Sequence, residues 1–168
     1  KSCEKPVTET QLNLESELNV LSDLLDNDTY PLQKAIHRRR SAVSMDRKTQ
    51  IDRNTFFQFL IKTCPQFNPA PFQSFPWEPQ VHLGLFVHRV NDLPTGLYLL
   101  VRNENHLKEL KEKFKKEFLW RKPDFCPEAL GLFVLEEGDY VGLSKSVSCG
   151  QDIAGDGCFS LGMLSAFE

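Results

Sequence analysis

The strongest constraint on the fold is an apolar alternation in the run 81–90. Leu83, Leu85 and Val87 occupy every second position, which places them on one face of an extended strand. The residues Asn-Asp-Leu-Pro-Thr-Gly that follow are typical of a turn, and 97–101 is a second β-patterned run. The two runs predict an antiparallel hairpin in which these three side chains are buried.

The chain before the hairpin shows helical patterns. Leucines at 14, 18, 21 and 25 share one helical face, and a second helix is expected from Pro31 into Arg38-Arg39-Arg40-Ser41. Asp52 or Asn54 can cap a third helix, whose apolar face consists of Phe56, Phe57, Leu60, Ile61 and Cys64. Residues 65–80 mix prolines with aromatic residues, which predicts a packed irregular loop.

After the hairpin, helical and extended patterns are mixed. Asn103 or Asn105 is expected to start a charged helix with one apolar face formed by Leu107, Leu110, Phe114 and Phe118. The run 130–135 predicts a central strand covered on both sides. A short helix at 140–149 and a last strand from Phe159 follow. This order predicts an α+β fold with a mainly antiparallel sheet flanked by helices.

Composition limits the class of protein. The 168 residues are 40% hydrophobic, enough for one core, so we expect a disordered lead-in or linker at 1–11 and one domain at 12–168. No apolar run approaches the roughly 20 residues of a membrane span, and no signal peptide is recognisable, so a cytoplasmic location without membrane contact is expected. A net charge of -3 argues against a nucleic-acid partner. Five dispersed cysteines predict reduced thiols and no metal site.

The cluster Arg38-Arg39-Arg40-Ser41 is the strongest local candidate for a binding site. Guanidinium groups match phosphate oxygens, and the hydroxyl can add another contact. A solvated helix end explains the cluster too, because the helix dipole favours cations there. Small and polar residues at 148–157 suggest close backbone approach, to a ligand or within a tight turn. His82 and His88 are expected on the less buried face of the sheet, and no pattern assigns a catalytic residue.

Three stretches in a fixed order resemble one family. They are Arg39-Arg40-Ser41-Ala42-Val43-Ser44-Met45-Asp46, with an R-x-S motif, then 83–100, in which Arg89-Val90 precedes Leu93-Pro94-Thr95-Gly96-Leu97-Tyr98, and finally 148–154 followed by 159–164. These stretches resemble the nitroreductase family of FMN flavoproteins, in the branch related to SagB-type dehydrogenases. The resemblance implies a nitroreductase-like fold, FMN at a homodimer interface, and hydride transfer between the flavin and a small-molecule substrate.

The resemblance also implies site residues. Arg39 and Ser41 would contact the FMN phosphate or ribityl chain, with Arg40 beside them, and we expect Arg39 and Ser41 at the rim of a pocket near the sheet. Many relatives carry a lysine or arginine two residues after the serine, where this chain has Val43.

Relatives also continue beyond the last strand, whereas this chain stops at Glu168. The domain 12–168 is therefore expected to be partial, with the missing C-terminal part supplied by a longer chain or another polypeptide. A flavin-free structural or protein-interaction module derived from this fold is the alternative. In either case we expect the apolar last strand to promote self-association of the isolated chain.

Overall fold

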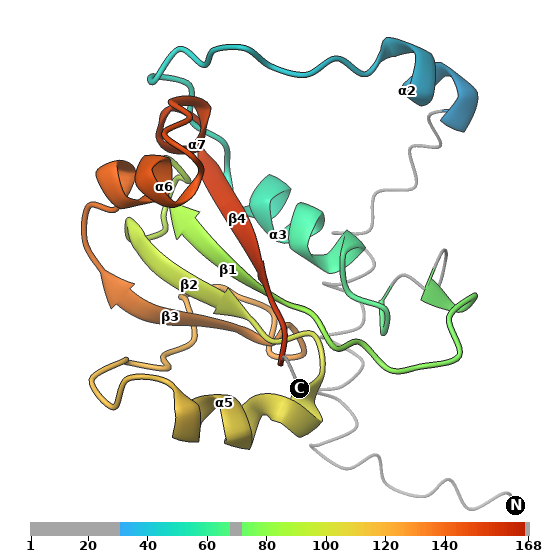
Figure 1. The fold of residues 1–168 in the computed structure, drawn as a ribbon, viewed down its shortest axis with the longest axis vertical. Coiled ribbons are helices and arrows are strands. Elements are labelled where there is room, and N and C mark those ends of the chain that lie inside the picture. The colour runs from blue at the N-terminus through green and yellow to red at the C-terminus, as the bar shows by residue number, and fades with distance from the viewer. Residues whose placement is uncertain (1–30, 68–71, 167–168) are drawn as a thin grey trace, which may run out of the picture.

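The computed structural model describes residues 31–67 and 72–166. It contains one four-stranded sheet in the order β3-β2-β1-β4, with every neighbouring pair antiparallel (Figure 1). The strands are β1 (His82–Val87), β2 (Gly96–Leu100), β3 (Leu132–Glu137) and β4 (Phe159–Leu164). The helices are α2 (Leu32–Arg38), α3 (Arg53–Lys62), α5 (Leu107–Lys113), α6 (Val141–Val147) and α7 (Ile153–Asp156), with a 3-10 turn, η1 (Glu104–His106), before α5. The α+β class is confirmed.

The predicted hairpin is present. Leu83 pairs with Leu100 and Val87 with Gly96 in an antiparallel register. Leu83, Leu85 and Val87 are buried, as the alternation predicts. Gly96 is required by packing, because a Cβ atom there would lie 2.3 Å from the Glu136 carbonyl oxygen of β3.

Helix α3 covers one face of the sheet and forms the main core with it. The Asp52 carboxylate caps the helix by accepting a hydrogen bond from Thr55 N at 2.9 Å, which satisfies one of the free amides of the first turn. The buried residues of the helix pack on β1, β2 and β3; they are Phe56, Phe57, Leu60 and Ile61. Burying each of these side chains contributes about 1.5–3 kcal/mol.

A smaller cluster covers the other face. Leu99, Val101 and Leu135 form its centre, and the apolar residues predicted to share one helical face pack against it; they are Leu107, Leu110, Phe114 and Phe118. The helix is shorter than expected, since α5 ends at Lys113 and Phe114 is already extended. Phe118 reaches the cluster from the following loop and not from the helix.

The run 130–135 was expected to form a central strand covered on both sides, and the central place is wrong, because β3 is an edge strand of the described sheet. Both faces are covered, since Leu132 and Val134 belong to the main core and Leu135 to the smaller cluster. An irregular segment pairs with the outer edge. Leu119 N donates to Leu135 O at 2.9 Å, and Arg121 forms a bridge with Val134. This segment covers the β3 edge much as another strand would.

β4 forms the opposite edge and is largely exposed. Leu161, Met163 and Leu164 all face solvent in the described structure, with Met163 76% exposed. The last strand expected from Phe159 is confirmed, because β4 begins there and pairs with β1.

Of the remaining predictions for the N-terminal part of the chain, some fall on residues that the structure describes and some do not. The leucine stripe at 14–25 and the lead-in at 1–11 lie outside the described residues. Helix α2 follows Pro31 and ends at Arg38, as predicted, and it lies away from the sheet at the start of an extended stretch (Figure 1). Within the described ranges, no helix combines the length and apolar character needed to cross a membrane.

Candidate functional site

A cleft of about 690 Å³ lies between the extended segment 44–51 and the turn that joins α7 to β4. Its volume falls within the range of about 300–1,000 Å³ typical of small-molecule sites. The cleft brings together two stretches that are about a hundred residues apart in sequence. The first contributes Ser44, Met45, Asp46, Thr49 and Ile51; the second contributes Ser148, Gln151, Ile153, Ala154, Asp156, Gly157, Cys158, Phe159 and Ser160.

Aromatic rings form one wall of the cleft. Phe59 projects from α3 and Phe159 from β4, with ring centroids 6.2 Å apart. The Phe159 ring also stands edge-on to Phe56 at 5.1 Å, which ties this wall to the core. The cleft therefore offers a rigid apolar surface beside the hydroxyl of Ser148 and the amide of Gln151.

A close helix contact shapes the opposite side. Gly155 of α7 lies against α6, and a Cβ atom there would come within 2.8 Å of the Val141 carbonyl oxygen. Gly155 thus serves a tight packing of backbone against backbone, which requires no ligand. Gly150 adopts a positive φ of 73° with open space around it, as expected of a turn.

A network of ion pairs joins the two sides of the cleft. The nearly buried carboxylate of Asp156 contacts Arg47 Nε at 2.7 Å through one oxygen and Lys145 Nζ at 2.8 Å through the other. Lys145 also contacts Asp152 at 2.8 Å. Hydrogen bonds from Lys145 and Arg47 lower the pKa of Asp156, so this carboxylate is ionised at neutral pH.

Asp46 organises the segment on the other side of the cleft. Its carboxylate accepts hydrogen bonds from Lys48 N and Thr49 N, both at 2.9 Å, and from the Thr49 hydroxyl. The Thr49 hydroxyl and these two amides lower the pKa of Asp46 to about 2. The carboxylate thus holds the local turn, and its negative charge is matched by these donors.

Two β1-end residues fix the α7–β4 turn. His88 Nε2 lies 3.1 Å from Ala154 O, and the Arg89 guanidinium donates to the carbonyls of Gly155 and Gly157. Burial lowers the pKa of His88, which is therefore neutral at pH 7. His88 was expected on a less buried face, which is wrong, because the α7 turn covers it.

The arginine cluster is not part of the cleft lining and follows α2, which lies away from the sheet (Figure 1). Arg39, Arg40 and Ser41 are exposed on the stretch after α2, and the lining begins three residues further on, at Ser44. Arg40 Nη1 donates to His37 O at 2.8 Å and to Arg39 O at 2.9 Å. These contacts fit a helix end in solvent and leave the Arg39 side chain in an exposed position.

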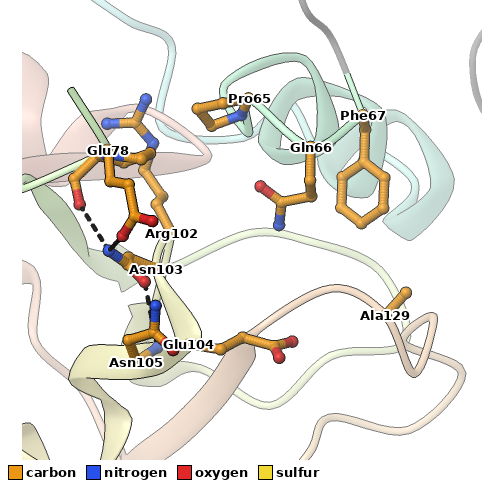
Figure 2. A pocket seen from close by; sticks show the side chains of 10 residues that line it. Pro65, Gln66, Phe67, Glu78, Arg102, Asn103, Glu104, Asn105 and Ala129 are labelled. Atoms are coloured by element: carbon orange, nitrogen blue, oxygen red, sulfur yellow. Dashed lines mark hydrogen bonds between the residues drawn. The ribbon is translucent and has the colours of Figure 1, made fainter. Parts of the chain in front are cut away.

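A second cleft, of about 600 Å³, lies at the far end of α3 (Figure 2). Asn103 donates to the Glu78 carboxylate at 3.0 Å and accepts from Asn105 N at 3.1 Å (Figure 2). Arg102 donates Nε to Thr63 O and Nη1 to Val81 O. These groups already have protein partners that hold the loop in place, so the first cleft is the better candidate site.

The sequence analysis pointed to stretches that line the first cleft but did not predict the ion pairs that join its two sides. Arg47, Asp156 and Lys145 come from three separate segments, and no local spacing relates them. Within residues 31–67 and 72–166, no three His, Cys, Asp or Glu side chains gather as metal ligands. Cys64 is buried in the core as a free thiol, and burial raises its pKa to about 11. Comparison of the chain with protein-family models, curated proteins and solved structures found no match.

Proposed function

We propose that the chain is part of an FMN-dependent oxidoreductase of the nitroreductase and SagB-type dehydrogenase kind, with the first cleft as part of its flavin site. The observation that carries the proposal is the meeting of two stretches that resemble this family. Residues that follow the R-x-S motif form one side of the cleft, and residues from the stretch beginning at Ser148 form the other. We also propose that the α+β fold is nitroreductase-like.

The residues around the cleft fit the chemical parts of FMN. The aromatic wall of Phe59 and Phe159 suits a planar ring system, and Gln151 offers an amide for polar ring atoms. Arg39 and Ser41 would hold the phosphate, with Arg40 adding positive charge near it. The Asp156 carboxylate opposes an anion little, because Arg47 and Lys145 are paired with it. Asp46 keeps its negative charge, since its hydrogen-bond donors are neutral, so the phosphate would have to lie toward Arg39 and away from Asp46.

Bound FMN would accept and donate the hydride, and the protein would supply position and electrostatics. Val43 brings no cation to the position where many relatives carry one, so the chain itself does not stabilise an anionic flavin from there. A small-molecule substrate is part of the proposal. A homodimer or a further C-terminal part of the same chain would complete the site.

FMN titration of the intact protein tests the proposal. Arg39→Ala should weaken FMN binding by about 1–3 kcal/mol, the scale of a lost charge-assisted contact. Lys34→Ala is the matched control, since it removes another exposed cation from α2 and should leave the affinity unchanged. Equal FMN affinity in the wild type and in Arg39→Ala would remove Arg39 from the site.

A flavin-free protein-interaction module is the second candidate. Val43 is 96% exposed and β4 presents apolar side chains at an open edge, which favours a surface made for another polypeptide. The colour of the purified protein distinguishes the two candidate functions. A yellow protein that releases FMN on denaturation supports the oxidoreductase. A colourless protein that does not bind added FMN supports the protein-interaction module.

A further inference from the structure

The side of the cleft that carries the R-x-S stretch is held by polar contacts. Residues 41–50 have no buried member, although Met45 is only 44% exposed and lines the cleft, so apolar burial contributes little to fixing their position. At the far end of this segment, Ile51 forms a parallel bridge with Val90, and the Cys158 thiol lies 3.3 Å from Thr49 O. These contacts anchor the chain from Thr49 onward. Closer to Ser41, the contact with the body of the protein is the ion pair of Arg47 with Asp156.

Arg47 adopts a backbone conformation that its own preferences disfavour. Its φ angle is 62°, in the left-handed region that residues other than glycine rarely occupy. Such a conformation persists when surrounding contacts determine it, and here the Asp46 carboxylate closes the turn around Arg47 by accepting from Lys48 N and Thr49 N. The turn directs the Arg47 side chain to the Asp156 carboxylate. Asp156 itself is nearly buried and is also held by Lys145, so the anchor point belongs to the rigid α6–α7 pair.

We propose that Asp156, acting through Arg47, is the positioning residue of the cleft, and that it places the R-x-S stretch for phosphate binding. The inference rests on the proposed function in taking Arg39 and Ser41 as the phosphate contacts. Asp156 touches no part of the ligand in this role. It keeps the segment 44–48 against α7, so that Ser41, three residues before the cleft lining, stays near the entrance.

The experiment compares two flavins in the intact protein. FMN carries the phosphate and riboflavin lacks it, so the ratio of their affinities reports the phosphate contacts alone. Arg47→Ala should weaken FMN binding roughly tenfold, a typical effect of a misplaced charge-assisted contact, and should weaken riboflavin binding clearly less, because the aromatic wall and Gln151 are untouched. The variant keeps Asp156 paired with Lys145, so it leaves no buried charge without a partner.

Two further variants sharpen the test. Arg47→Lys retains a cation that can reach Asp156 and should restore part of the preference for FMN. Lys48→Ala removes the neighbouring exposed cation and should leave the preference as in the wild type. A general loss of structure in Arg47→Ala would weaken both flavins alike, and that outcome would overturn the positioning role.

Amide hydrogen exchange provides a readout without flavin. In Arg47→Ala, exchange across 44–48 should accelerate roughly three- to tenfold, while α5 should exchange as in the wild type. Unchanged exchange across 44–48 would overturn the inference. Wild-type protein that binds neither flavin would overturn the proposed function instead, and accelerated exchange in Arg47→Ala would still show that the Arg47–Asp156 pair positions the segment.

Discussion

His82 Nε2 lies 3.1 Å from His106 Nδ1, and the two imidazole rings meet edge to face. The hydrogen bond has a defined direction, because Arg102 N donates to His82 Nδ1 at 3.1 Å. Neutral His82 therefore carries its proton on Nε2 and donates it to His106. Protonation of His82 at Nδ1 would break the bond from Arg102 N, so the contact between His82 at the start of β1 and Arg102 after β2 requires neutral His82.

Stability should fall as the pH drops below about 6.5. Burial, then the neighbouring charges of His106 and Arg102, lower the pKa of His82 from its usual 6.5, and burial lowers that of His88 too. The unfolded chain therefore binds more protons than the folded protein as the pH falls from 6.5 through the lowered values. Urea unfolding at a series of pH values measures this loss, which should be absent above the usual pKa.

A histidine variant locates the source of that pH dependence. His82→Asn retains an acceptor for Arg102 N and removes the titrating ring, so stability should fall less steeply below pH 6.5, with a residual slope from His88. His37→Asn replaces an exposed histidine of α2 and should leave the slope unchanged. An identical slope in His82→Asn and the wild type would exclude His82 as its origin.

Asp52→Ala should destabilise the protein by about 1 kcal/mol, because it removes the side-chain cap of α3. Asn54→Ala changes the other cap candidate, which lies one residue inside the helix and is exposed, and should cost less than about 0.5 kcal/mol. Chemical denaturation of the two variants side by side makes the comparison. Equal effects would contradict the cap seen in the structure.

Leu85→Ala should cost about 2–5 kcal/mol, because its side chain is fully buried between α3 and the sheet. Met163→Ala truncates an apolar side chain of the neighbouring strand that is 76% exposed, and should change stability by less than about 0.5 kcal/mol. The midpoints of denaturant unfolding give both values. A small loss in Leu85→Ala would place the core elsewhere.

The open edge should promote self-association of the isolated 168-residue chain. Met163→Lys places a charge on β4, the means by which natural edge strands avoid pairing, and should shift the chain toward monomer without loss of stability. Light scattering over a concentration series measures the effect, with Gln33→Lys on α2 as a control that adds the same charge at an exposed position away from β4. A wild-type chain that remains monomeric throughout would contradict the prediction.

Local patterns predicted the parts of the fold that local chemistry determines. The alternation around Leu85 predicted the hairpin, and Asp52 predicted the start of α3. The place of β3 at the sheet edge was not predictable in this way. Its apolar run resembles that of a central strand because the two core clusters cover both faces. The segment around Leu119 that pairs with its outer edge has no strand pattern.

The candidate site was predicted only in outline. The resemblance indicated two stretches, and the structure brings residues of both to one cleft. The ion pair that joins the two sides of the cleft was not predicted, because Arg47 and Asp156 are ordinary charged residues 109 positions apart. Only the folded arrangement shows that they meet. The role of Arg39 and Ser41 stays a prediction.

The unequal edges of the sheet have a consequence for how ligands and partners influence each other. The segment near Leu119 closes the β3 side, so among the described strands only β4 offers a free row of backbone groups for another strand. That row begins at Phe159, which is also part of the cleft wall. A polypeptide that extended the sheet there would border the cleft, and the two binding events would be thermodynamically coupled. If binding of the added strand raised the affinity for the small molecule by some factor, binding of the small molecule would raise the affinity for the strand by the same factor.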